Sequence, residues 1–185
     1  MAPILGIWAS SKSTVAADTG AMFPLQVITV GPAGASSISF TNIPTTGYAH
    51  LQIRATLRGT GDIGYQILRF NSDTGSNYAG HGINTNGSTV STFADVNNDT
   101  AGQQNASGTA DIFTAYVIDI LDYQNTNKFK TVRTLSGFDT NGAGTLSFRS
   151  ALWRSTSAIT SMSFAPNTNN YAQYSQFALY GIKGA

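Results

Sequence analysis

The stretch YVIDILDYQNTNKFKTVRTLSGF, residues 116–138, is the most apolar and most β-prone part of this sequence. Two runs rich in β-branched and aromatic residues, 116–123 and 129–135, flank the polar cluster 124–127. Such runs separated by a short polar loop predict a β-hairpin. The near-continuous apolar run of the first strand is typical of a strand inside a sheet. We therefore predict that this hairpin forms the middle of a sheet.

The rest of the chain repeats this alternation of short apolar runs and turn residues. Residues 50–58 alternate strictly, which predicts a strand with one buried and one solvated or interface-facing side. Residues 139–142, DTNG, contain an Asn-Gly pair that favours a type I′ turn. The pattern predicts about nine to eleven short strands. They are expected near residues 26–30, 36–40, 50–58, 65–70, 78–83, 90–93, 112–123, 128–137, 144–154, 159–164 and 174–182.

Short strands punctuated by turns, with no helical period of any length, predict an all-β fold. The expected architecture is an antiparallel β-sandwich or jelly roll. A length of 185 residues without a recognisable linker indicates a single sandwich domain, residues 26–185. Residues 1–25 carry apolar side chains without a clear period and are interpreted as a short extended N-terminal arm. A neighbouring subunit or the arm's own domain could hold it, and a disordered tail is the further alternative.

The composition excludes several classes of partner. Charged residues make up 10% of the chain, against about 25% in a typical soluble protein. The net charge is +1 and the basic residues are scattered, which argues against nucleic-acid binding. No stretch approaches the ~18 apolar residues of a membrane span, so no membrane partner is predicted. The chain has no cysteine, which excludes disulfides, thiolate zinc sites and a cysteine nucleophile.

No group of residues predicts a catalytic, metal or cofactor site. His50 and His81 are interpreted as structural, and no serine lies in a nucleophile elbow. Asp119, inside an apolar run, is expected to pair with Arg133 or Lys130 of the adjacent strand.

The loop-rich region 71–109 is long enough to be functional or to be clamped by a partner. Asp95, Asp99 and Asp111 could hold calcium, but turn chemistry explains them equally well and no EF-hand spacing is present.

Aromatic residues are the candidates for glycan binding. Aromatic side chains of β-sandwiches lie mostly in the core, and the same is expected for most of those in this chain. Tyr171 and Tyr174 lie beside the polar loop 166–170 and are the best candidates for stacking on a sugar ring.

Several segments together resemble a family of small structural proteins of tailed bacteriophages. The resemblance covers nearly the whole chain, and its closing motif is the most specific. It implies a virion component with a lectin-like β-sandwich, on the head or in the tail, and it carries over no catalytic residue. The segments are ILGIWASS (4–11), YAHLQIR (48–54), LRFNSDTGSNY (68–78), VIDILDY (117–123), KTVRTLSG (130–137) and FALYGIKG (177–184).

Three hypotheses follow. The first is a homo-oligomeric decoration (cement) protein on the capsid surface, bridging major capsid protein subunits. Its partner-binding anchor would be the apolar residues Ile4, Leu5, Ile7 and Trp8 of the arm. The second is a tail or fibre domain that binds host surface glycan through Tyr171 or Tyr174. The third, an enzyme such as a depolymerase, lacks the necessary cluster of carboxylates or of histidine with a nucleophile, so a non-enzymatic role is expected.

Overall fold

A computed structural model of the chain describes residues 21–103 and 105–184. Within these ranges the chain forms eleven β-strands and no helix. The all-β prediction is therefore confirmed, and the number of strands agrees with it. The strands are β1 (Met22–Thr29), β2 (Ile38–Phe40), β3 (His50–Leu57), β4 (Gln66–Phe70), β5 (Tyr78–Thr85), β6 (Val90–Asn98), β7 (Thr114–Leu121), β8 (Lys130–Asp139), β9 (Gly144–Trp153), β10 (Met162–Pro166) and β11 (Gln176–Ile182).

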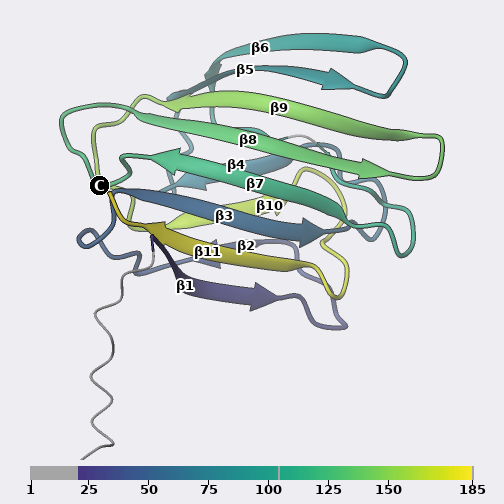
Figure 1. Cartoon of the computed structure of the whole chain (residues 1–185), viewed down its shortest axis with the longest axis horizontal. Coiled ribbons are helices and arrows are strands. Elements are labelled where there is room, and N and C mark those ends of the chain that lie inside the picture. Colours follow the sequence, from purple (N-terminus) through teal and green to yellow (C-terminus); the bar gives the residue numbers. More distant parts are fainter. Residues whose placement is uncertain (1–20, 104, 185) are drawn as a thin grey trace, which may run out of the picture.

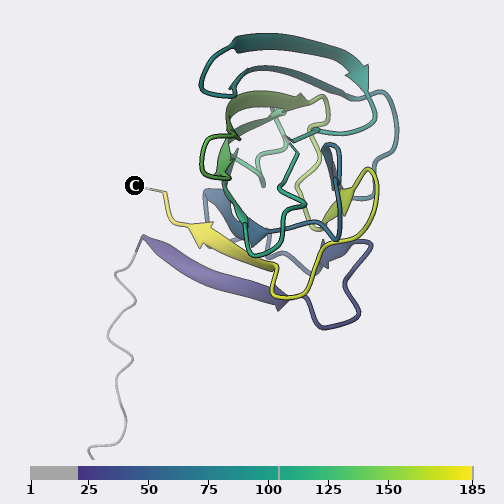
Figure 2. The same cartoon turned by 90° about the vertical axis from the view of Figure 1, so that its right-hand side faces the viewer.

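The strands form two antiparallel sheets. One sheet has eight strands in the order β1-β11-β3-β7-β8-β9-β5-β6, and the other has three in the order β2-β10-β4. The three-stranded sheet lies behind the larger one in Figure 1, and Figure 2 shows the two layers from the side. The predicted hairpin is β7–β8, which occupies the two central positions of the larger sheet. The prediction from residues 116–138 is confirmed in both type and position.

The turns follow the local chemistry of the sequence. Asn141 and Gly142 join β8 to β9 with φ values of 61° and 113°. The backbone N–H of Thr140 donates to the carbonyl of Ala143 across the turn. A type I′ turn requires positive φ at both central residues, which asparagine and glycine tolerate best. The Asn-Gly turn is therefore where the sequence predicts it.

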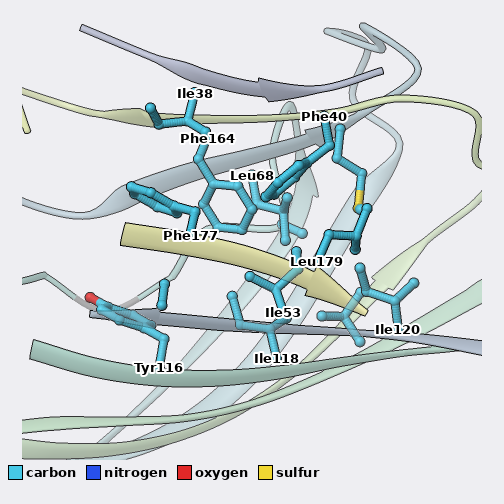
Figure 3. Close-up of a cluster of buried hydrophobic side chains, with 14 of the residues drawn as sticks. Ile38, Phe40, Ile53, Leu68, Tyr116, Ile118, Ile120, Phe164, Phe177 and Leu179 are labelled. Atoms are coloured by element: carbon cyan, nitrogen blue, oxygen red, sulfur yellow. The ribbon is translucent and has the colours of Figure 1, made fainter. Parts of the chain in front are cut away.

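The hydrophobic core lies between the two sheets. Phe40 of β2 and Phe164 of β10 point from the smaller sheet toward Ile53, Ile118 and Phe177 of the larger one (Figure 3). Each fully buried side chain of this kind contributes about 1.5–3 kcal/mol. Strand β3 alternates as predicted, with its apolar set inward.

Two segments differ from expectation in extent. Strand β1 begins at Met22, so the last residues assigned to the arm already pair with β11. The loop-rich region contains β5 and β6, which are longer than the short irregular strands expected there. These two strands form a hairpin that lies beyond the three-stranded sheet, at the top of Figures 1 and 2. One face of the hairpin is therefore not covered by the second sheet.

Candidate functional site

The predicted arm anchor Ile4, Leu5, Ile7 and Trp8 lies outside the described residues. Its proposed contact with a partner remains a prediction.

The two predicted glycan-binding tyrosines have opposite environments. Tyr171 is fully buried, packs edge-on against Phe177 and donates a 2.7 Å hydrogen bond from its hydroxyl to Gln66 Oε1. Burial raises the pKa of Tyr171 well above its ordinary value. Tyr171 is therefore a core residue and does not stack on a sugar, which corrects the prediction. Tyr174 is 70% exposed and has a φ of 70°. Its backbone N–H donates a hydrogen bond to the carbonyl of Val30 at the β1 edge.

The histidines do not form a catalytic group. His50 Nδ1 accepts a 2.9 Å hydrogen bond from the backbone N–H of Asp122. His81 is exposed on β5. Three strands, β7, β8 and β9, separate β3 from β5 in the sheet, which places the two side chains at least about 19 Å apart.

Asp119 lies opposite Arg133 in the β7–β8 register, but its Oδ1 accepts a 2.8 Å hydrogen bond from Gln52 Nε2. The alternative partner Lys130 points to the other side of the sheet and is fully buried. Its Nζ donates to the carbonyls of Asn125, Lys128 and Thr156. Burial lowers the pKa of Lys130. Lys130 therefore closes the β7–β8 loop and does not pair with Asp119.

The loop carboxylates serve as partners of arginines. Asp95 contacts Arg149 at 3.2 Å and Asp99 contacts Arg69. Among the described residues, no group of three or more histidine, aspartate or glutamate side chains is arranged to hold a metal ion.

No helix in this part of the chain is long and apolar enough to cross a membrane.

The outer surface of the larger sheet carries a cluster of exposed apolar side chains, here called the apolar face. Four of them form one cross-strand row, because Val117 pairs with Leu135, Leu135 with Phe148, and Phe148 with Ile83. Directly opposite side chains on neighbouring strands lie about 4.5–5.5 Å apart, so this row is continuous. Leu135 and Phe148 are 50% and 49% exposed. The apolar face comprises Ile83, Val90, Val117, Leu135, Leu146 and Phe148.

A polar row borders the apolar face. It runs through Asp119, Arg133, Ser150 and His81, two residues along each strand from the apolar row. Beyond the apolar row, in the direction away from the polar row, a depression of about 790 Å³ extends between the β8–β9 turn, the β5–β6 turn and β7. An exposed apolar patch with a polar rim is typical of a protein interaction site.

The opposite side of the same strands is polar toward the β8–β9 turn, whereas farther along the strands it carries the core residues Val132, Trp153 and Tyr78. The inner row passes through Ser136, Ser147, Asn84 and Ser91 on β8, β9, β5 and β6. Ser147 Oγ donates to Asn84 Oδ1 at 2.7 Å. A groove of about 330 Å³, here called the polar groove, lies on this side and is lined mainly by Tyr65, Asn84, Phe93, Asp95, Asp99 and Arg149.

Arg149 organises the polar groove. Its guanidinium carbon lies 3.9 Å from the centre of the Phe93 ring, and its Nη2 is 3.2 Å from Asp95 Oδ2. The Arg149 side chain is only 11% exposed, and burial lowers its pKa, although an arginine stays charged. Gly82 lies opposite both Arg149 and Phe93. A Cβ at Gly82 would come within 2.2 Å of the Phe93 ring, so glycine makes room for the ring.

Neither the apolar face nor the polar groove was predicted from the sequence. One signal was present in residues 144–154, where two sets of side chains alternate. One set is Leu146, Phe148, Ser150 and Leu152, and the other is Thr145, Ser147, Arg149, Ala151 and Trp153. The alternation does not say which set faces the core, and the more apolar set faces outward.

No family model, curated protein or solved structure matches the chain.

Proposed function

We propose that this chain is a non-enzymatic structural protein of a tailed-bacteriophage virion. Its role is that of a capsid decoration (cement) protein, which bridges major capsid protein subunits and stabilises them by burying surface across their contacts. The observation that carries the proposal is the apolar face, a continuous exposed row over β7, β8, β9 and β5. The sequence resemblance to structural proteins of tailed bacteriophages supports another virion protein as the partner that covers the apolar face.

The chemistry of the surface suits repeated contacts with a large shell. A chain with 10% charged residues has few ions to strip of water when its surface is buried. Side chains such as Phe148 and Leu135 gain about 25 cal/mol for each Å² of apolar surface they bury. We assign the apolar face to the major capsid protein, and we expect several copies of the chain to cluster on the symmetric lattice.

Quantitative mass spectrometry of purified virions tests the proposal. For a decoration protein, we expect a copy number of the same order as that of the major capsid protein. A copy number many times lower would contradict decoration of the head and would indicate a tail or fibre component.

A second candidate function is the binding of host surface glycan by a tail or fibre domain. The polar groove favours it, because the groove combines the exposed ring of Tyr65 with amide, carboxylate and guanidinium groups. Sites for small polar ligands commonly have this form, with a few converging polar groups in a concave surface.

A further inference from the structure

We propose that the polar groove binds a neutral saccharide, which stacks on Tyr65 and forms hydrogen bonds with Asn84, Asp95 and Arg149. This inference rests on the second candidate function. It does not depend on what covers the apolar face.

The size and shape of the groove fit a short saccharide. Its volume of about 330 Å³ lies at the lower end of the ~300–1,000 Å³ range of ligand sites. Tyr65 stands at the wall with 46% of its surface exposed, whereas Tyr171 is buried in the core and Tyr174 lies at the β1 edge, across the sheet from β6. Tyr65 is therefore the exposed tyrosine that the polar groups of the groove surround.

The charges of the groove select a neutral ligand. Arg149 is paired with Asp95, and Asp99 is paired with Arg69. An acidic sugar would meet two carboxylates and no guanidinium without a counter-ion. A sugar hydroxyl both donates and accepts, so it can use the lone pairs that remain on a carboxylate and the N–H groups that remain on a guanidinium.

The groove is organised before any ligand arrives. Arg149 is held between the Phe93 ring and Asp95, and Ser147 holds the Asn84 amide through its oxygen. An amide whose oxygen accepts from Ser147 still has its two N–H donors for a ligand. Side chains fixed in this way lose little conformational entropy on binding, which favours affinity for a small ligand.

The test is a glycan array probed with the full chain, followed by titration of the best neutral glycan against wild type and variants. Tyr65→Ala removes the stacking surface, and we expect an affinity loss of about tenfold or more. Tyr65→Phe keeps the ring and is expected to stay within about threefold of wild type. Tyr174→Ala is the matched control, an exposed tyrosine outside the groove, with unchanged affinity expected.

Circular dichroism of each variant checks that the fold is intact. Three results would overturn the inference: no neutral glycan is bound, only acidic glycans are bound, or Tyr65→Ala binds as well as wild type. If Tyr174→Ala alone loses binding, the site lies at the β1 edge and not in the groove. None of these results bears on the decoration role, which the copy number in virions tests separately.

Discussion

The two halves of the larger sheet differ in the residues on their inner sides. In the half formed by β1, β11, β3 and β7, Ile53 and Ile118 point into the sandwich and Gln52 points outward. In the half formed by β8, β9, β5 and β6, Ser147 and Arg149 point inward while Phe148 is exposed. Both halves contribute to the core with the three-stranded sheet, since Phe177 of β11 packs on Phe164 and Trp153 of β9 packs on Phe70. The β5–β6 hairpin of the second half lies beyond that sheet (Figures 1 and 2).

This difference concentrates the two candidate surfaces in one half of the sheet. The hydrophobic effect fixes the first half, because its apolar side has a second sheet to bury it. In the second half the inner side is mixed. Val132, Trp153 and Tyr78 belong to the core. Toward the β8–β9 turn the inner side becomes polar at Arg149 and Ser147, while Phe148 between them is exposed. The second half therefore lines the polar groove and carries most of the apolar face, to which β7 of the first half adds Val117.

The largest effect is expected from substitution on the apolar face. The double variant Leu135→Asp with Phe148→Asp should weaken binding to capsids assembled without the protein by more than about a hundredfold. Central interface residues cost about 2 kcal/mol or more each, and 1.4 kcal/mol is tenfold. The free energy of unfolding should fall by more in the double variant than in either single variant, because the two carboxylates face each other across β8 and β9. Circular dichroism therefore has to show that the double variant is folded before its capsid binding is compared.

Phe129→Asp is the matched control for that experiment. Phe129 is 48% exposed, like Phe148, but lies in the β7–β8 loop outside the apolar face. It should leave capsid binding unchanged. Equal loss of capsid binding in Phe129→Asp and Phe148→Asp would contradict the proposal that the apolar face is the capsid-binding surface. Self-association of the isolated wild type that disappears in the double variant would assign the face to a second copy.

The inner side of the same half should respond in stability. Gly82→Ala places a Cβ 2.2 Å from the Phe93 ring and 3.0 Å from the carbonyl of Phe148. Overpacking of this kind costs about 1–3 kcal/mol. Gly80→Ala, on the same strand and the same side, meets nothing closer than 3.4 Å and should cost much less. Urea unfolding of the two variants measures the difference, and equal values would contradict the tight fit of Phe93 against Gly82.

A smaller effect is expected from the contact between Arg149 and Phe93. A double-mutant cycle with Arg149→Met and Phe93→Leu should give a coupling free energy of about 1 kcal/mol in unfolding measurements, since desolvated cation–π contacts reach about 2 kcal/mol and exposed ones about 0.5. Strictly additive effects of the two substitutions would show that the guanidinium and the ring do not stabilise each other.

Sequence reasoning predicted the fold well wherever burial follows hydrophobicity. The strict alternation of residues 50–57 predicted both the strand and its buried face, since Leu51, Ile53 and Leu57 have a sheet to pack against. The Asn141-Gly142 turn was equally predictable, because its backbone chemistry is local.

The candidate site was not predictable, because it depends on register and on what lies beyond each strand. Ile83, Leu135 and Phe148 are far apart in sequence and form a row only through the pairing of β5, β8 and β9. Tyr171 and Tyr174 are three residues apart, yet one is buried and the other exposed. Composition and periodicity carry neither fact.

The smallest effect concerns a carboxylate tied to the inner side of β9. Asp73 Oδ2 accepts a 2.7 Å hydrogen bond from Trp153 Nε1. Burial alone would raise the pKa of Asp73, but bonds from Trp153, Gly75 and Asn77 outweigh it and hold the pKa below the ordinary 3.8. Between the lowered pKa of the folded state and 3.8, the unfolded chain binds more protons. The contribution of Asp73 to stability is therefore complete above this range and is lost as the pH falls through the folded pKa.

Asp73→Asn keeps an oxygen that can accept from Trp153 but cannot ionise. Urea unfolding from about pH 5 to about pH 2 should therefore show a steeper loss of stability in wild type than in the variant. Parallel curves would show that the bond to Trp153 does not depend on the charge of Asp73. The variant should leave capsid binding at the apolar face unchanged. Asp73 and Trp153 lie on the inner side of the sheet, so the ionisation of Asp73 affects the stability of the fold and not the contact made by the outer side.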